Sequence, residues 1–274
     1  MPHHPPVTGT TRLFAIIGDP IAQVRSPEVF AALFAARGID AVMVPMRVAP
    51  ADLETALSGL AAIANLEGLI ATVPHKIACA RLARALGPVA RLAGGANALR
   101  RHPDGGFEGE MFDGIGFVAA LRAAGEDPAG KRVLVVGAGG VGSAIAAALL
   151  REGPARLALV DVARERAQAL ADRLRGAGGA TAVEVASTPE PAGFEIVVNA
   201  TPLGMRPDDG LPLDPERVDP GALVADVIMK PPRTRLLERA ASRGCRVLEG
   251  RHMLDRQAPL IADYFGLGCP PSRS

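Results

Sequence analysis

Residues 131–153, KRVLVVGAGGVGSAIAAALLREG, are the stretch that decides the fold. The apolar run VLVV predicts a buried strand, the glycines predict a tight turn, and the alanine-rich run after them predicts a helix. The turn matches the G-x-G-x-x-G pattern, in which backbone amides at the start of a helix face a pyrophosphate that no side chain obstructs. We therefore predict a Rossmann-type domain that binds a dinucleotide through Gly137, Gly139, Gly140 and Gly142, with a plain glycine-rich turn as the alternative.

An aspartate closes the next predicted strand. Asp161 ends the apolar run LALVD, about two dozen residues after the first glycine of the turn, where a carboxylate accepts hydrogen bonds from the ribose hydroxyls of a dinucleotide. A carboxylate in that place also repels a 2′-phosphate, so we predict NAD rather than NADP as the cofactor. Arg164 and Arg166 lie close enough to keep NADP possible, and a solvated strand end is the alternative for Asp161.

Strands and helices alternate on both sides of this stretch. Apolar runs such as RLFAIIGDP at 12–20 and LEGLIATVP at 66–74 are separated by helical patterns, and the alternation restarts at Gly130. Such alternation predicts an α/β fold with mainly parallel sheets.

The length of 274 residues exceeds the usual size of one domain. We expect an N-terminal α/β substrate-binding domain at 1–116, with residues 1–11 as a flexible tail, and a Rossmann NAD(P)-binding domain at 117–250. The C-terminal helix within 251–274 is expected to pack back on the first domain and complete it.

The charges of the chain nearly cancel. Lys and Arg number 30 against 29 Asp and Glu, so no large cationic field exists to bind nucleic acid or an anionic membrane. No apolar run reaches the length of a membrane span, and the first residues lack the apolar region of a signal peptide. The cysteines and histidines lack metal-ligand spacing, so we expect no metal site. We predict a cytoplasmic protein, either monomer or homodimer, that acts on a small molecule.

Several ordered motifs resemble those of the shikimate dehydrogenases. They are GDPIAQVRSP (18–27), TVPHK (72–76), GGANAL (94–99), GEMFDGIG (109–116), NATPLGM (199–205), ADVIMKPPRTRLL (225–237) and GRHMLDRQ (250–257). The resemblance covers nearly the whole chain. It implies hydride transfer between NAD(P) and a ring hydroxyl in a cleft between the two domains, and it adds Asn199 and Thr201 to the cofactor-binding residues.

Under this resemblance Lys76 and Asp113 are the catalytic pair. Oxidation of a ring alcohol requires removal of its proton as hydride leaves for the nicotinamide. A lysine ammonium beside the developing oxyanion stabilises charge in either direction of the reaction. Asp113 is implied to hold the lysine and to bind the same or an adjacent hydroxyl. The alternative for Lys76 is a solvated charge at the end of a buried strand.

The resemblance also implies a set of substrate-binding residues. Thr72, Asn97 and Gln257 match residues that bind the hydroxyls of the substrate, and Ser26 matches one of two serines that bind its carboxylate. Taken singly, Ser26 has the alternative of a helix cap and Gln257 that of a helix-surface residue.

The motifs depart from the family pattern at five positions, which we expect to cluster in the substrate pocket. They are Val24 for the first carboxylate-binding serine, Ile70 for an asparagine, Met111 and Phe112 for Asn-Thr, and Met229 for a tyrosine. A lost hydroxyl forfeits a charge-assisted hydrogen bond of about 1.5–3 kcal/mol. Arg25 is the candidate replacement, because a guanidinium can grip a carboxylate through two bonds.

We therefore predict a divergent member of the family that acts on shikimate or a close hydroxylated cyclic carboxylate such as quinate. One alternative is a noncatalytic regulatory module that binds NAD or a cyclic acid, which the retained Lys76 and Asp113 disfavour. The other is a dehydrogenase with a different cyclic substrate, which explains Asn97 and Gln257 less well.

Overall fold

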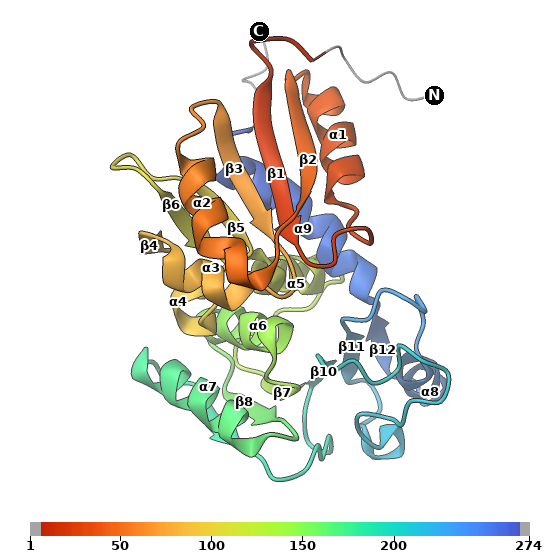
Figure 1. Cartoon of the computed structure of the whole chain (residues 1–274). Helices are drawn as coiled ribbons and strands as arrows, with labels where there is room; N and C mark the ends of the chain where they lie inside the picture. The colour runs from red at the N-terminus through yellow and green to blue at the C-terminus, as the bar shows by residue number, and fades with distance from the viewer. Residues whose placement is uncertain (1–6, 269–274) are drawn as a thin grey trace, which may run out of the picture. The chain divides into compact units, whose positions relative to one another are not determined.

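Two units, joined at Phe112–Asp113 and again at Gln257–Ala258, make up the described residues 7–268 of the computed structural model (Figure 1). The first unit is discontinuous, because it combines the residues up to Phe112 with those from Ala258 onward. Strands and helices alternate in both units, which confirms the predicted α/β class. Of the predicted tail at 1–11, residues 1–6 lie outside the described part, and a turn closed by the bond from Thr8 N to Thr11 Oγ1 precedes the first strand.

A mixed sheet forms the first unit, with the strand order β2-β1-β3-β5-β6-β4. The strands are β1 (Arg12–Gly18), β2 (Ala41–Arg47), β3 (Leu66–Ala71), β4 (Ala85–Leu86), β5 (Ala98–Arg101) and β6 (Phe107–Glu110). β1, β2 and β3 are parallel, as predicted, but β5 runs antiparallel to both β3 and β6. The parallel pattern fails there because a tight turn joins β5 to β6, with positive φ angles of 90° at Gly105 and 71° at Gly106.

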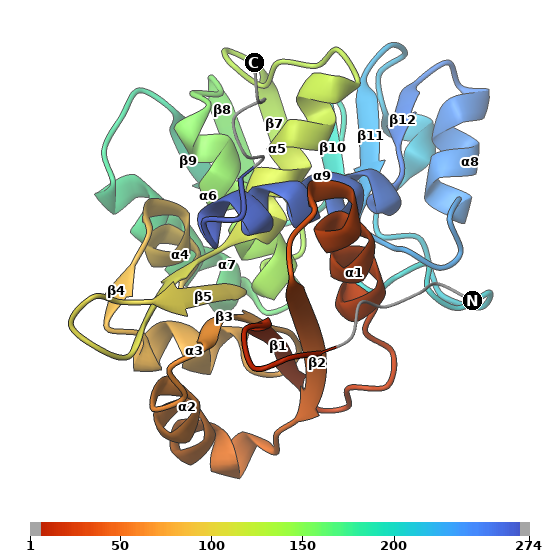
Figure 2. The ribbon, with the colours of Figure 1, turned by 90° about the horizontal axis from the view of Figure 1, so that it is seen from above.

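Helices cover both faces of this sheet. They are α1 (Ser26–Arg37), the short η1 (Pro50–Asp52), α2 (Leu53–Ala61), α3 (Lys76–Leu82), α4 (Pro88–Ala93) and the last part of α9 (Gly250–Tyr264). On one face of β1, the ring of Phe14 lies 5.6 Å from Phe34 of α1 and 5.3 Å from Phe265, which follows α9. On the other face, Ile17 packs with Leu53 and other core residues of α2 and α3, and Figure 2 shows the same division of the helices.

The second unit contains a fully parallel sheet in the order β12-β11-β10-β7-β8-β9. The strands are β7 (Arg132–Val136), β8 (Arg156–Val160), β9 (Ala182–Val185), β10 (Ile196–Asn199), β11 (Leu223–Asp226) and β12 (Arg246–Leu248). The helices are α5 (Phe112–Ala123), α6 (Gly140–Arg151), α7 (Arg164–Gly176), the short η2 (Pro215–Arg217), α8 (Arg235–Ser242) and α9. The strand order reverses between β7 and β10, and ligands of such sheets bind at the carboxyl ends of the strands beside this reversal.

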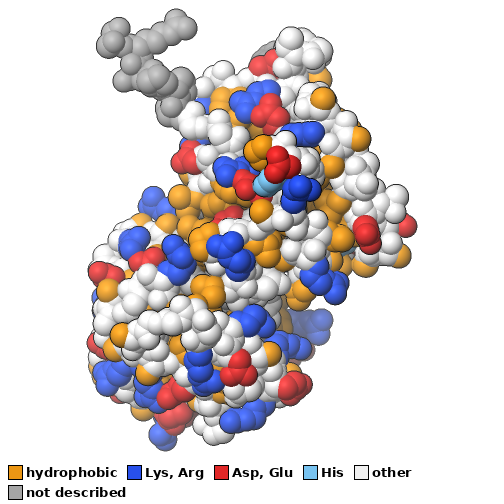
Figure 3. Space-filling view, turned by 90° about the vertical axis from the view of Figure 1, so that its left-hand side faces the viewer, with side chains coloured by type: hydrophobic (Ala, Val, Ile, Leu, Met, Phe, Trp, Pro, Cys, Tyr) orange, Lys and Arg blue, Asp and Glu red, His pale blue; other side chains and the backbone are white. Residues whose placement is uncertain are grey.

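The surface carries charges of both signs. Figure 3 shows basic and acidic side chains interspersed on the visible face, in keeping with a formal net charge of +1. Within residues 7–268, no helix is both long enough and apolar enough to cross a membrane.

Candidate active site

The glycine-rich turn lies at the carboxyl end of β7, beside the reversal of strand order. The predicted strand, turn and helix are confirmed, since β7 ends at Val136 and α6 begins at Gly140. Gly137 adopts a φ angle of 102°, which side chains rarely tolerate, and a Cβ atom there would lie 2.8 Å from the backbone of Ala200. A Cβ atom at Gly142 would overlap the carbonyl oxygen of Gly137. These two glycines are therefore required by the turn itself.

The middle of the turn is open. A Cβ atom built at Gly139 or Gly140 would meet no heavy atom within 4 Å. Gly139 has an ordinary φ angle of −71° and occupies the N-cap position of α6. Space in front of a helix N-terminus fits a pyrophosphate, so the chain can hold a dinucleotide here.

We predict that Gly142→Ala will destabilise the second unit by about 1–3 kcal/mol or more, because overpacking against backbone cannot be relieved by a side-chain rotation. Gly139→Ala is the matched control and should change the free energy of unfolding by less than about 0.5 kcal/mol, since its Cβ enters open space. Chemical unfolding of both variants without cofactor measures the difference. Equal stability would contradict the steric argument.

Asp161 follows β8 and is tied to the same turn. Its Oδ2 accepts a hydrogen bond of 2.6 Å from the amide of Ala138, and its Oδ1 accepts one of 2.9 Å from the amide of Ala163. The side chain is 6% exposed, whereas that of Arg166, whose Nη1 lies 3.5 Å from Oδ1, is 57% exposed. Asp161 is therefore not a solvated strand end. Its carboxylate stands at the glycine turn, where the resemblance places the ribose of the cofactor.

The loop after β10 contains the predicted cofactor residues Asn199 and Thr201. Asn199 is fully buried, and its Oδ1 accepts hydrogen bonds from the amide and the hydroxyl of Thr201, at 3.0 and 2.7 Å. Its Nδ2 donates to the carbonyl of Leu203 and to Asp226, both at 3.1 Å. With its amide group used in this way, Asn199 holds the loop together rather than facing a ligand.

Large apolar side chains are exposed on the loops at the carboxyl ends of this sheet. They are Val162 after β8, Leu203 and Met205 after β10, and Met229 after β11. All four follow strands at the end of the sheet where ligands of such folds bind.

In the first unit, Lys76 is the first residue of α3 and follows the carboxyl end of β3. The preceding His75 is buried, and its Nε2 lies 2.8 Å from the carbonyl of Val48, just beyond β2. The carbonyl of Lys76 accepts a hydrogen bond of 2.9 Å from the amide of Ala96, next to the predicted Asn97. Two neighbouring segments therefore fix the backbone of Lys76.

Asn97 lies where β3, β5 and the end of β6 meet. It is 3% exposed, and its Oδ1 accepts a hydrogen bond of 2.7 Å from the amide of Phe112, the residue before Asp113. The backbone amide of Asn97 donates a hydrogen bond of 3.0 Å to the carbonyl of Glu110. Thr72 directly follows the last residue of β3, and its backbone amide donates a hydrogen bond to the carbonyl of Ile17 on β1. The structure thus places Thr72, Lys76 and Asn97 in one region of the first unit.

Glu110 is a buried residue that is not among the site residues predicted from the sequence. Its Oε1 accepts hydrogen bonds from the amides of Ala90, in the first turn of α4, and Met111, at 2.7 and 2.8 Å. A Cβ atom at Gly87 would overlap its carboxylate. Glu110 therefore connects α4 to the segment before Asp113. The fold alone brings Gly87 and Glu110 together, so no sequence signal pointed to this contact.

In the second unit, Asp113 and Gln257 form a buried pair. They are 5% and 7% exposed, and Gln257 Nε2 donates a hydrogen bond of 2.7 Å to Asp113 Oδ1. Helices α5 and α9 approach closely at Gly116, where a Cβ atom would lie 2.8 Å from the carbonyl oxygen of Met253. The surface alternative for Gln257 is wrong, because the residue is buried against the predicted catalytic aspartate.

Ser26 and Arg25 lie at the start of α1. The helix begins at Ser26 itself, and its N-cap position is Arg25, where no side chain caps the helix. The cap alternative for Ser26 is therefore wrong by one position. The side chain of Arg25 is 69% exposed, and its Nε lies 3.4 Å from Glu28, an ion pair too exposed to hold the guanidinium firmly.

The five departures from the family pattern do not share one environment. Ile70, Met111 and Phe112 are buried, and Phe112 packs against Tyr264 with ring centroids 5.2 Å apart. Val24 is half-buried, and Met229 is 39% exposed. Three of the departures are thus core residues of the first unit. Their effect on a substrate would pass through the position of neighbours such as Asn97.

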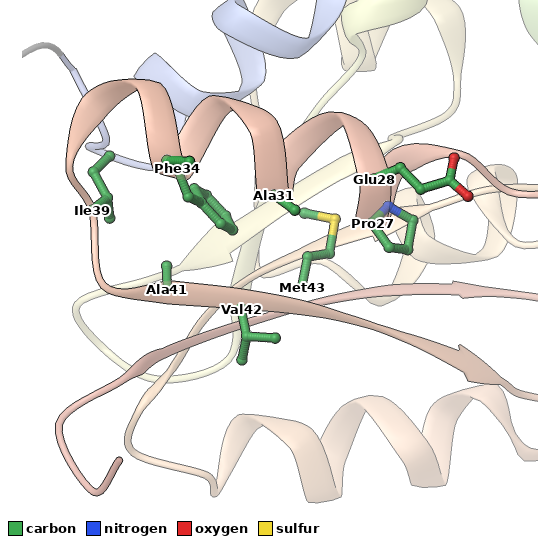
Figure 4. Close-up of a pocket in the computed structure, with 9 residues that line it drawn as sticks. Pro27, Glu28, Ala31, Phe34, Ile39, Ala41, Val42 and Met43 are labelled. Carbon is green, nitrogen blue, oxygen red and sulfur yellow. The ribbon is translucent and has the colours of Figure 1, made fainter. Parts of the chain in front are cut away.

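A cavity of about 260 Å³ lies elsewhere in the first unit, between α1 and β2. Figure 4 shows Phe34, Ala31 and Met43 around it, with Glu28 at one end. None of the predicted site residues lines this cavity. Among residues 7–268, no cluster of three or more His, Cys, Asp or Glu side chains is placed to hold a metal ion.

Two family models match the chain. The shikimate dehydrogenase substrate binding domain matches residues 16–99, and the shikimate / quinate 5-dehydrogenase model matches residues 119–202. The shikimate dehydrogenase (NADP(+)) of Rubrobacter xylanophilus is 40% identical over 253 residues, which are 91% of this chain and 89% of that protein. The chain belongs to the shikimate dehydrogenase family. This confirms the predicted family and the predicted class of NAD(P)-dependent oxidoreductase.

Solved structures of shikimate dehydrogenases and related enzymes resemble the chain along most of its length. Shikimate 5-dehydrogenase from Listeria monocytogenes, in complex with shikimate and NAD, has a TM-score of 0.89 and 28% identity and covers 97% of this chain and 95% of that one. The ligand-free 5-ketofructose reductase of a Gluconobacter species has a TM-score of 0.86 and 29% identity and covers 94% of both chains. Similar chains thus include a reductase named for a different substrate, and the roles assigned above to single residues stay predictions.

Proposed function

We propose that this protein oxidises shikimate or quinate reversibly, with NAD as the preferred hydride acceptor. The observation that carries the proposal is the buried Asp113–Gln257 pair, with a 2.7 Å hydrogen bond, in a chain that also retains Lys76 at the start of α3. A buried carboxylate is costly unless hydrogen bonds or charges compensate for it. The burial of Asp113 beside Gln257 is best explained by a role in binding a substrate hydroxyl.

Three residues share the proposed chemistry. When bound, the dinucleotide supplies the hydride acceptor for the oxidation. Lys76 takes the proton of the reacting hydroxyl and stabilises the negative charge that develops on its oxygen. Asp113 accepts a hydrogen bond from the same or an adjacent hydroxyl, and Gln257 fixes the orientation of the Asp113 carboxylate.

Four other residues hold the substrate in this proposal. Asn97 and Thr72 bind the remaining hydroxyls, and Ser26 and Arg25 bind the carboxylate of the substrate.

The preference for NAD rests on the surroundings of Asp161. The carboxylate is held between two backbone amides and cannot turn away from a 2′-phosphate without losing both hydrogen bonds. The next residue, Val162, is exposed and carries no charge to neutralise a phosphate. Curated relatives carry NADP(+) in their names, so this chain would differ from them in its cofactor.

The test of this function is the rate of formation of reduced nicotinamide, by absorbance, with shikimate and with quinate, each supplied with NAD and with NADP. Turnover of either acid supports the dehydrogenase, and a higher kcat/KM with NAD supports the assignment of Asp161. Binding of dinucleotide without turnover of either acid would contradict the proposed substrate and leave the regulatory module. We further propose a cytoplasmic location, since the reaction uses soluble cofactors.

A dehydrogenase with a different substrate is the second candidate. The observations in its favour are Val24, an apolar residue in place of a carboxylate-binding serine, and the similarity to 5-ketofructose reductase. Inclusion of 5-ketofructose with reduced dinucleotide in the same assay separates the two candidates.

Arg25→Ala is expected to raise the KM for shikimate by about 10- to 100-fold, because a hydrogen bond to a charged group contributes about 1.5–3 kcal/mol. The value of kcat should change little, since Arg25 would bind the carboxylate equally in the ground state and the transition state. Steady-state kinetics measure both constants. Arg81→Ala, at an exposed position on α3, is the control for loss of a surface cation. An unchanged KM in Arg25→Ala would refute the proposed carboxylate contact.

A further inference from the structure

The second unit contains a buried carboxylate that has no part in the proposed chemistry. Asp226 ends β11 and is 2% exposed. Its Oδ2 accepts hydrogen bonds from Asn199 Nδ2 at 3.1 Å and from Thr234 Oγ1 at 2.8 Å, and its Oδ1 accepts one from the amide of Ile228 at 3.0 Å. None of the ion pairs between residues 7 and 268 includes it, and burial raises the pKa of the Asp226 carboxyl. A buried carboxylate costs free energy unless hydrogen bonds or charges compensate for it, and for Asp226 the compensation comes from these three hydrogen-bond donors.

The partners of Asp226 hold the loop after β10. Asn199, fixed by Asp226 at its Nδ2, uses its Oδ1 to order Thr201, and the hydroxyl of Thr201 accepts a hydrogen bond of 3.1 Å from the amide of Leu203. Thr234, the N-cap of α8, packs against Gly204 of the same loop, where a Cβ atom would lie 3.6 Å from its side chain. Asp226 thus connects β10, β11 and α8 through side chains that are at most 2% exposed.

The loop after β10 packs directly against the glycine turn. The amide of Ala200 donates to the carbonyl of Val136 at 2.7 Å, directly before Gly137. A Cβ atom at Gly137 would lie 2.8 Å from the Ala200 backbone and 3.1 Å from the Thr201 side chain. A shift of the loop by a fraction of an ångström therefore changes the space at the first glycine of the turn.

We propose that Asp226 is a positioning residue for the dinucleotide, which acts through Asn199 and Thr201 to set the loop after β10 against the glycine turn. This proposal rests on the proposed function and deepens it. Asp226 would act indirectly, because its carboxylate keeps the Asn199 amide in the one orientation that orders both Thr201 and Leu203.

The test uses four variants of the full chain. Asp226→Asn places an amide donor against groups that already donate, Thr234→Val removes one hydroxyl with little change of shape, and Thr234→Ser keeps that hydroxyl. Val224→Ala is the matched control, because it removes buried volume from the same strand and leaves the hydrogen bonds of Asp226 intact. Two quantities are measured well below the midpoint of thermal unfolding. They are the hydrogen exchange of the Thr201 and Leu203 amides, and the Kd for NADH by fluorescence.

Asp226→Asn and Thr234→Val are expected to speed the exchange and to raise the Kd for NADH by about tenfold or more, as for loss of a charged hydrogen bond. Thr234→Ser and Val224→Ala should stay within about twofold of the wild type in Kd. Should Asp226→Asn fail to fold, Thr234→Val decides the question.

Unchanged exchange and Kd in the Thr234→Val variant would overturn the proposal, as would an equal rise of Kd in Val224→Ala. A wild-type chain that binds neither NADH nor NADPH would refute the proposed function instead. The exchange at Thr201 and Leu203 would still decide whether Asp226 holds the loop.

Discussion

Lys76→Met is expected to lower kcat for shikimate oxidation by about 10³-fold, within the 10²–10⁴ range of general acid–base catalysis. The methionine fills a similar volume but neither takes the proton nor stabilises the alkoxide. The stability of the chain should not fall, because a cation at the first position of a helix is opposed by the helix dipole. The backbone contacts of Lys76, through His75 and Ala96, remain in the variant.

Single-turnover and steady-state rates, together with the Tm and the Kd for NADH, test this prediction. Arg81→Met is the control, since it removes a cation from an exposed position on the same helix. A rate within about tenfold of the wild type in Lys76→Met would place the residue outside general acid–base catalysis. A large loss of Tm would instead indicate a structural role.

Asp161→Asn is expected to lower the preference for NAD over NADP, measured as the ratio of kcat/KM values, by about 100-fold. Two unit charges about 4 Å apart near a protein surface repel by about 4 kcal/mol before screening, so removal of the carboxylate charge should favour NADP strongly. Loss of acceptor capacity toward the ribose lowers kcat/KM with NAD as well.

The salt dependence of the NADP reaction separates charge from geometry. In the wild type, kcat/KM with NADP should rise with ionic strength as the repulsion is screened, and in Asp161→Asn this rise should disappear. Asp172→Asn, an exposed position on α7, is the control for the same change of charge in the same unit. An unaltered cofactor ratio in Asp161→Asn would show that the charge of Asp161 does not set the preference for NAD.

The parts of the site that depend on local sequence were predictable. The glycine turn needs only a strand, a φ angle of 102° and room beside the next turn of helix, and all three are encoded within residues 133–142. The buried strand before Lys76 was predictable in the same way, but Lys76 is not at its end, because β3 ends at Ala71 and Lys76 is the first residue of α3.

The parts that depend on packing between distant segments were not predictable. The direction of a side chain at the end of a strand is decided by what packs there, so Met111 and Phe112 turned into the core instead of a pocket. Asn199 looks like a ligand-binding residue in its motif, but Asp226 and Leu203 occupy its amide. The hydrophobic periodicity of the sequence also does not predict that β5 is antiparallel, since the hairpin turn at Gly105 and Gly106 sets that direction.

The discontinuous first unit has a consequence for synthesis of the chain. Phe265 stacks on Phe14 and occupies the space that Gly68 leaves by having no side chain, so this core lacks a central ring until Phe265 itself is translated. Contacts of such long sequence separation form slowly. The second unit is continuous in sequence, so all of its residues are translated before Phe265 is. Residues 12–112 therefore complete their core only after the second unit has been made, and a nascent chain that stalls short of Phe265 exposes an aromatic surface that chaperones and proteases recognise.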